Sequence, residues 1–335
     1  MATPSDFIGA FKCCFRGRFD LHYHLGNVHI LAGPISGDRG DKRGGSDMVD
    51  TSKHAGLEEV VGQGLPAYAS RGLERRASSV TELCARAYRF LGGLLDFKPR
   101  VTVLVLSEAD WPSRSAVALY GMPNYAEGNL CIAGERAAFW REIVDGIIGA
   151  FPEAEGELRP VYGQPDGTID VSPFFDLLAV HELAHEFHAQ GGVRFPRLWL
   201  REFFCNLALH AFVASEEPSA LPVLETFPRL VARIPATAFP CRTLDAFEAV
   251  YDGMPGPNYG WYQCRMHVAA KELYDAGGVE PIRRLWRAFR AEEAPLFEFL
   301  GRNVHPDLKR IAERLDRPRA RAESPPPARS TRASA

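Results

Sequence analysis

A run of five residues, 181–185, constrains the fold of this chain more than any other feature. It reads His-Glu-Leu-Ala-His, so two histidines stand four residues apart and a glutamate follows the first. On an α-helix, residues i and i+4 share one face, and both imidazoles could then reach a single metal ion. Glu182 would lie about 100° further round the helix and overhang the same cleft, where it could accept a proton from a metal-bound water. The run therefore predicts a metal centre built on a helix.

The flanking residues predict where this helix begins and ends. Ser172 can cap its N-terminus, and Pro173 suits the first turn, where a missing N–H costs nothing. Two glycines at 191–192 are typical of a helix C-terminus. The apolar residues in between predict a core helix that presents its histidines to a buried cleft. The alternative is that both histidines are ordinary core residues and Glu182 is solvated.

A second helix, predicted from 197 to about 214, offers a third metal ligand. A catalytic zinc usually has three protein ligands and an open position for water. The helix is apolar almost all round and should be buried, except for Glu202, Asn206 and His210 at four-residue spacing. A buried carboxylate needs a charged partner or a metal. Glu202 is therefore the expected ligand, and Asn206 the expected hydrogen-bond partner of a ligand histidine. His210 lies too far along the axis to share the ion. The alternative for Glu202 is an ion pair with Arg194, Arg197 or Arg201.

Residues 181–185, followed by 199–202 with the sequence Trp-Leu-Arg-Glu, resemble the gluzincin zinc metallopeptidases. The likeness is to the branch with a W-L-x-E motif, which includes thermolysin-like and aminopeptidase-like domains. It covers about residues 100 to 290. The metzincin pattern does not fit, because it needs glycine at position 188 and histidine at position 191, where the chain has His188 and Gly191.

The resemblance implies a ligand set and a reaction. One zinc ion (Zn²⁺) would be held by His181, His185 and Glu202. Glu182 would be the general base that takes a proton from the metal-activated water, and the reaction would be hydrolysis of a peptide bond. His188 lies on the same helical stripe as the two ligand histidines. It could touch the cleft, or it could be an ordinary satisfied histidine.

The resemblance also implies roles for residues outside the two helices. Gluzincins commonly place a tyrosine at the start of a later helix, where its hydroxyl bonds the oxyanion. Tyr262 fits that place better than Tyr259, and the alternative for both is aromatic packing. In the family, an edge strand before the zinc helix pairs with extended substrate backbone. The corresponding strand here is 128–133, which contains Leu130 and Cys131.

Three departures from the family favour a second interpretation, a domain that binds a peptide or protein partner with weak or no turnover. The 16-residue gap between His185 and Glu202 is slightly short. Phe203 stands where relatives often have glycine, and 121–124 only approximates a Gly-Ala-Met-Glu-Asn motif. Against this, a binding domain has no need of Glu182 as a base. A purely structural zinc would usually have four cysteine-rich ligands, and the seven cysteines lack that spacing.

Composition limits the partners and the compartment. A net charge of −3 gives no argument for a nucleic-acid partner, and no run of about 20 apolar residues predicts a membrane helix. The expected partner is therefore a peptide or protein substrate. Seven scattered cysteines without a C-x-x-C pair are typical of a reducing compartment. The N-terminal apolar run is interrupted by Lys12 and is unlike a signal peptide, so we expect a cytoplasmic protein.

The order of predicted elements favours an α+β fold, with a small mixed β-sheet packed on the zinc helix and a mostly helical C-terminal lobe. The resemblance to gluzincins implies that this fold is zincin-like. Apolar residues at steps of four and three predict a long helix over 73–94, and 101–106 reads as a buried strand. Four parts are expected. They are an N-terminal hairpin and flexible Gly-rich charged linker (1–60), an α+β sub-domain ending in the zinc helix (61–192), a helical sub-domain with the third ligand (193–316) and a disordered tail (317–335).

Overall fold

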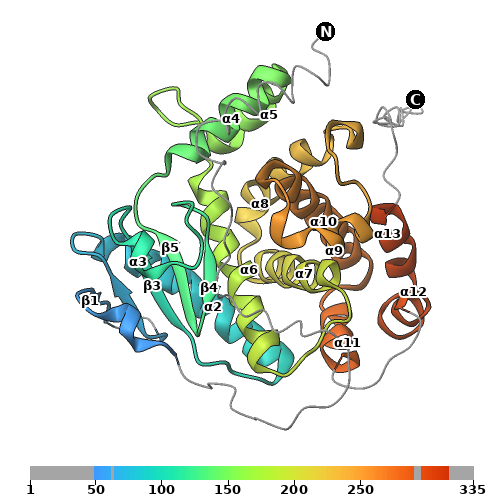
Figure 1. Cartoon of the computed structure of the whole chain (residues 1–335), viewed down its shortest axis with the longest axis horizontal. Helices are drawn as coiled ribbons and strands as arrows, with labels where there is room; N and C mark the ends of the chain where they lie inside the picture. The colour runs from blue at the N-terminus through green and yellow to red at the C-terminus, as the bar shows by residue number, and fades with distance from the viewer. Residues whose placement is uncertain (1–48, 62–63, 290–295, 317–335) are drawn as a thin grey trace, which may run out of the picture.

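A small β-sheet and a larger set of helices make up the residues that the computed structural model describes, 49–61, 64–289 and 296–316 (Figure 1). The α+β class is thereby confirmed. The expected N-terminal hairpin and C-terminal tail lie outside the described residues. Within them, no helix combines the length and the apolar character that a bilayer crossing requires. The division into sub-domains at residue 193 stays a prediction.

The sheet is mixed and has five strands, arranged as β1, β2, β3, β5 and β4 across its width. The parallel pairs β2–β3 and β3–β5 form its centre, and the antiparallel pairs β1–β2 and β5–β4 form its two margins. β3 and β5 are buried along their whole length, as the apolar runs at 101–106 and 128–133 predict. The strands are β1 (Glu58–Glu59), β2 (Ala67–Ala69), β3 (Thr102–Leu106), β4 (Asn124–Ala126) and β5 (Asn129–Ala133).

The prediction that 128–133 forms the edge strand is wrong. β5 lies between β3 and β4, and Leu130 pairs with Val103 on one side and Tyr125 on the other. The edge is β4. The cause is a two-residue turn, Glu127-Gly128, in which both residues have positive φ, 50° and 76°. This is typical of the type I′ turn that joins two antiparallel strands, so one more strand folds back outside β5.

Two long helices cover the same face of the sheet. α2 (Glu74–Leu95) packs on β2 and β3, α6 (Ser172–Gln190) packs on β4 and β5, and the two helices contact each other. The predicted stripe of α2 is buried at Ala77, Val80, Cys84, Ala87 and Leu91. α6 begins one residue earlier than predicted, because Ser172 is its first residue and donates its N–H to the carboxylate of Asp170.

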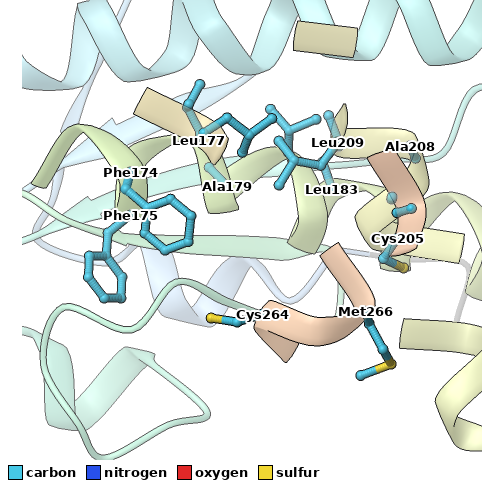
Figure 2. Packing of buried hydrophobic residues seen from close by; sticks show 14 of the residues in the cluster. Phe174, Phe175, Leu177, Ala179, Leu183, Cys205, Ala208, Leu209, Cys264 and Met266 are labelled. Carbon is cyan, nitrogen blue, oxygen red and sulfur yellow. The ribbon is translucent and has the colours of Figure 1, made fainter. Parts of the chain in front are cut away.

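α6 is also one wall of the helical lobe. α7 (Leu198–Glu216) packs against α6 on one side and α10 (Gly256–Gly277) on the other, and α8 (Leu221–Ala232) contacts both α6 and α10. α7 is buried almost all round, as predicted. Figure 1 shows α6 and α7 at the centre of the molecule, between the sheet and the helices α8, α9, α10 and α13. Figure 2 shows part of the shared core, with labelled side chains from α6, α7 and α10, among them Leu183, Leu209 and Met266.

The remaining helices surround this centre. The helices are α3 (Trp111–Arg114), α4 (Ala138–Ala150), α5 (Ala154–Tyr162), α9 (Leu244–Ala249), α11 (Glu280–Ala288), α12 (Leu296–Phe299) and α13 (Pro306–Asp316). Short helical turns at Thr51–His54, Pro218–Ala220, Ala236–Ala238, Tyr251–Gly253 and Leu300–Val304 complete the described structure.

Candidate metal centre

Three potential ligand atoms from α6 and α7 converge on one point. The Nε2 atoms of His181 and His185 lie 3.1 Å apart. Oε2 of Glu202 lies 3.3 Å from the first and 3.5 Å from the second. All three side chains are buried, with exposed fractions of 5%, 3% and 1%. Two neighbouring helices thus bring the predicted ligands together.

These separations suit a small cation with tetrahedral coordination. Ligand bonds of about 2.1 Å at tetrahedral angles place two ligand atoms about 3.4 Å apart. The observed distances of 3.1, 3.3 and 3.5 Å scatter around that value. Two imidazole nitrogens and one carboxylate oxygen form a donor set that zinc accepts. Burial lowers the pKa of His185 to about 4, so that its ring is neutral, as a metal ligand must be.

Glu202 is held in place by side chains from three directions. Its Oε1 accepts hydrogen bonds from Arg201 at 3.1 Å and from the hydroxyl of Tyr251 at 2.8 Å. Its Oε2 accepts from Nε2 of Gln263 at 2.8 Å and from the hydroxyl of Tyr259 at 3.4 Å. Burial alone would raise the pKa of Glu202, but the neighbouring histidines and Arg201 hold it well below its usual range. The carboxylate is therefore ionised.

The ion pair that was the alternative role for Glu202 is also present. Arg201 contacts Oε1, whereas His181 and His185 face Oε2. The two interpretations are therefore compatible, because they use different oxygens of one carboxylate. Arg201 also donates to Tyr251, and its guanidinium lies beside the candidate metal centre.

Asn206 does not bond a ligand histidine, contrary to the prediction. Its Nδ2 donates to the backbone carbonyl of Glu202 at 3.0 Å and to Oε1 of Gln263 at 2.8 Å. It thereby orients Gln263, whose own amide donates to Glu202. Nδ1 of His181 is buried and has no partner among the residues that the structure describes. The prediction failed because the Asn206 amide is engaged by the Glu202 carbonyl and by Gln263 of α10, a partner that spacing on α7 alone cannot reveal.

His188 lies behind the metal centre and not in the cleft. Its Nε2 is 3.0 Å from Nδ1 of His185, and it is absent from the lining of the pocket described below. Burial lowers the pKa of His188 well below its usual range. The ring of Tyr125, from the edge strand β4, stacks on His185 with a centroid distance of 4.9 Å. His185 is thus fixed on both sides.

Glu182 faces open space instead of a partner. Its carboxylate makes no hydrogen bond or ion pair with any residue in the described ranges, and it lines the same pocket as the three ligand residues. Burial raises the pKa of Glu182 well above its usual range, and the charge of Glu202 raises it further. A carboxylate in this environment is a stronger base than one in water.

The pocket over the centre has a volume of ≈ 570 Å³. Its polar end contains the three ligand residues, Glu182, Arg201, Asn206, Tyr251, Tyr259 and Gln263, and β4 contributes Asn124 and Tyr125. The other end is apolar and is formed by α4, α6 and α8. This volume lies within the range of about 300–1,000 Å³ that is typical of small-molecule sites.

The prediction that Tyr262 reaches the site is wrong. Its hydroxyl donates to the backbone carbonyl of Thr243 at 2.7 Å, and its ring is 1% exposed. Tyr259, one turn earlier on α10, lines the pocket and contacts Glu202. α10 is rotated so that Tyr259 and not Tyr262 faces Glu202 of α7.

The described strand β5 also stays out of the site. Leu130 and Cys131 are 0% exposed, and neither lines the pocket. The Sγ of Cys131 lies 3.7 Å from the backbone carbonyl of Arg114. The residues of the edge strand that do reach the pocket belong to β4, which the sequence reading did not predict.

A second group of potential ligand atoms includes a cysteine. The side chains of His181, His185 and Cys205 have ligand atoms within 4.8 Å of one another, and all three residues are buried. This group could also hold a metal ion. Burial raises the pKa of the Cys205 thiol well above its usual range, and the charge of Glu202 raises it further. The thiol is therefore protonated.

Sequence reasoning missed four residues of the site. They are Tyr125, Tyr251, Gln263 and Cys205, of which three come from segments distant from the H-E-x-x-H run. One signal was available: Tyr259, Gln263 and His267 recur at four-residue spacing on α10, matching the polar stripe of α7. No comparable signal marks Tyr251, which lies on a short turn.

Comparison with known proteins produced no matching family model, no matching curated protein and no matching solved structure.

Proposed function

We propose that this protein is a zinc-dependent peptidase of gluzincin type with a zincin-like fold. One observation carries the proposal. The Nε2 atoms of His181 and His185 and Oε2 of Glu202 are mutually 3.1–3.5 Å apart, and the partner-free carboxylate of Glu182 shares their pocket. Structural metal sites do not require a free base beside the ligands, whereas hydrolytic ones do.

His181, His185 and Glu202 would hold the ion. When bound, zinc would act as a Lewis acid that lowers the pKa of water and polarises the substrate carbonyl. The four donors around Glu202 keep its carboxylate oriented, since metal ligands are commonly fixed by such partners. No residue on α7 other than Glu202 and Cys205 offers a ligand near the two histidines in the described structure.

Glu182 would be the general base. It accepts a proton from the attacking water as the new C–O bond forms at the peptide carbonyl, and it later donates that proton to the leaving nitrogen as the C–N bond breaks. Its pKa is raised toward neutral pH, and a general base whose pKa lies near the pH of the reaction both accepts and returns a proton efficiently. The Tyr259 hydroxyl, which lines the pocket, is the donor best placed to reach a substrate oxygen.

The edge strand β4 would bind the peptide backbone. It is the outermost strand on the side of α6, and Asn124 and Tyr125 line the pocket. An exposed edge can receive an extended peptide as an additional strand. This assigns to β4 the role that the sequence reading had given to 128–133.

Hydrolysis of a peptide library tests the proposal. Cleavage should be abolished by a chelator, be restored by added zinc, and be lost in Glu182→Gln with zinc still bound. Glu216→Gln, which changes an exposed carboxylate at the end of α7, is the matched control and should retain full activity. A Glu182→Gln variant as active as the parent would refute the assigned base.

A second candidate function is a metal site that serves structure alone. Cys205 favours it, because a fourth protein ligand would close the coordination sphere. The binding-only interpretation has lost one of its supports, since Phe203 is 0% exposed and does not line the pocket. A closed site predicts tight metal binding, no cleavage of any peptide, and metal affinity that depends on Cys205.

A further inference from the structure

Arg201 brings a positive charge to the wall of the pocket, directly beside the candidate metal centre. It precedes Glu202 on α7, and its side chain is 11% exposed. No other arginine and no lysine of the described ranges lines the pocket. Because a guanidinium is not deprotonated in proteins, this charge is permanent.

One edge of the guanidinium is held by its neighbours. Nε and Nη2 of Arg201 lie 3.3 and 3.1 Å from Oε1 of Glu202, and Nη2 also donates to the hydroxyl of Tyr251 at 2.9 Å. The ring of Tyr251 adds a cation–π contact, with its centroid 5.2 Å from the guanidinium carbon. The guanidinium is therefore fixed before any ligand arrives, which lowers the entropy cost of binding one.

The opposite nitrogen, Nη1, is left for a ligand. It makes no hydrogen bond or ion pair with any residue that the structure describes, so both of its N–H groups lack a protein acceptor there. The other polar groups on this wall are engaged with one another. The amide of Asn206 donates to that of Gln263, and Gln263 donates to Tyr259 and Glu202. Arg201 thus keeps donors that its neighbours do not use.

The charge of Arg201 also lacks a full counter-charge. Oε1 of Glu202 faces Arg201, whereas Oε2 faces the two histidines and would bind the proposed ion. One negative charge is then shared between two cations. A largely desolvated cation without a full counter-charge is unfavourable, and an anionic group in the pocket would supply what is missing.

Two other lining groups do not replace Arg201 in this role. Nε2 of His267 is buried and has no partner within the described part of the chain, but burial lowers the pKa of His267 to about 3, so its ring is neutral and attracts no anion by charge. Asp252 carries a negative charge, and it is exposed, where water and salt screen it. Recognition of an anion therefore depends on Arg201.

Resting on the peptidase function proposed above, we propose that Arg201 binds a carboxylate of the peptide substrate close to the cleaved bond. Carboxylate matches the planar guanidinium in shape and charge. A peptide carries this group at its free C-terminus and on aspartate and glutamate side chains. Arg201 touches the proposed ligand Glu202, and the last two residues of a peptide are only about 3.8 Å apart from Cα to Cα. The site would then trim free C-termini or cleave beside acidic residues, according to which carboxylate it takes.

Binding to a variant that cannot hydrolyse separates this recognition from catalysis and distinguishes the two sources. The probes are N-acetylated pentapeptides of one sequence with glutamine at the centre. The first has a free C-terminal carboxylate, the second a C-terminal amide, and the third a C-terminal amide with glutamate replacing the glutamine. Their affinities for zinc-loaded Glu182→Gln are measured by calorimetry.

One carboxylate peptide should bind about 10- to 100-fold more tightly than the neutral second peptide, since hydrogen bonds to charged groups contribute on this scale. Preference for the first peptide assigns the C-terminus as the ligand of Arg201. Preference for the third assigns an acidic side chain.

Substitutions of Arg201 show whether this residue is responsible. In the Glu182→Gln background, Arg201→Gln should abolish the preference, and Arg201→Lys, which keeps a charge without the planar fork, should retain part of it. The preference is a ratio of two affinities measured on one variant, so any loosening of Glu202 affects both peptides alike. Arg194→Gln, at an exposed arginine outside the pocket, is the matched control and should leave the preference unchanged. Thermal denaturation shows whether each variant is folded.

Each outcome bears on one proposal or the other. No binding of any peptide, equal affinities for all of them, or a preference that persists in Arg201→Gln would overturn the carboxylate site. The comparison of the peptides on Glu182→Gln alone already decides this if Arg201→Gln does not fold. A preference that depends on Arg201, with no cleavage of any peptide by the parent protein, would leave the carboxylate site standing and sink the peptidase function.

Discussion

Nδ1 of His185 lies 3.0 Å from Nε2 of His188, and both rings are buried on α6. The pKa of His188 is far below neutrality because of its burial, so its ring is neutral and can accept a hydrogen bond. If His185 donates its Nδ1–H to that acceptor, its Nε2 carries the lone pair that faces His181 and Glu202. In that arrangement His188 would select the tautomer of His185 that the proposed metal site requires.

Replacing His188 should weaken metal binding. His188→Phe removes the acceptor, and loss of such a partner of a ligand histidine typically costs 10- to 100-fold in metal affinity. His188→Gln keeps an acceptor oxygen and should recover part of that loss. Zinc affinity is measured by competition with a chromogenic chelator. Equal affinities for the parent and both variants would show that His188 does not orient His185.

Glu202 and Cys205 can be distinguished as third ligand. Loss of a residue that only hydrogen-bonds a metal ligand lowers metal affinity by at most roughly 100-fold. Glu202→Gln should lower zinc affinity by more than this, because Glu202 is the proposed ligand itself, whereas Cys205→Ser should have little effect. Cobalt substitution gives an independent signal, because a thiolate ligand produces an intense near-ultraviolet charge-transfer band. That band should be absent in the parent protein. A band that disappears in Cys205→Ser would instead assign the cysteine to the metal.

Removing the hydroxyl of Tyr259 should lower activity, whereas removing that of Tyr262 should lower stability. Tyr259→Phe removes the hydroxyl that lines the pocket, and loss of an oxyanion donor lowers kcat by about 100- to 1,000-fold. Tyr262→Phe removes the bond to the Thr243 carbonyl, which should reduce the free energy of unfolding by about 1 kcal/mol and leave kcat/KM unchanged. Kinetics and urea denaturation of both variants check this. The reverse pattern would restore the role that the sequence assigned to Tyr262.

Acid should destabilise the fold through the buried histidines of α7 and α10. Burial lowers the pKa of His210 to about 4, against an ordinary value of 6.5, and that of His267 to about 3. The unfolded chain binds these protons below pH 6.5 while the folded protein does not. The free energy of unfolding should therefore fall as the pH decreases from 6.5 to 4, by on the order of 3 kcal/mol for His210.

His210→Phe should flatten that pH dependence. Nδ1 of His210 is buried without a partner in the described structure, so an apolar ring loses no hydrogen bond there. Urea denaturation at pH 7 and pH 4.5 measures the difference, and His305→Gln, at a half-exposed histidine, is the control that should leave it unchanged. A pH dependence as steep in His210→Phe as in the parent would contradict the assignment.

Several elements could be predicted because their signals are local. The range of α6 follows from Pro173 and the glycines at 191–192, and the stripe of α2 follows from its periodicity. The two buried strands β3 and β5 follow from continuous apolar runs. The ligand positions of His181 and His185 depend only on helical geometry.

Other parts depended on contacts between distant segments. β4 was not predicted, because its place at the sheet edge depends on the turn at Glu127 and Gly128, where both residues have positive φ. The choice between Tyr259 and Tyr262 depends on how α10 is rotated against α7, and an aromatic pattern on one helix does not specify that rotation.

The sequence by itself determined that two imidazoles and a carboxylate share one helix, and that a buried acid on the following helix needs a partner. Only the tertiary structure decided which oxygen of Glu202 faces the histidines and which faces Arg201, and that Gln263, Tyr251 and Tyr125 complete the site. The reason is physical: helical periodicity fixes neighbours along a chain within a few ångströms, whereas the packing of α6, α7, α10 and β4 is fixed by their combined side-chain shapes.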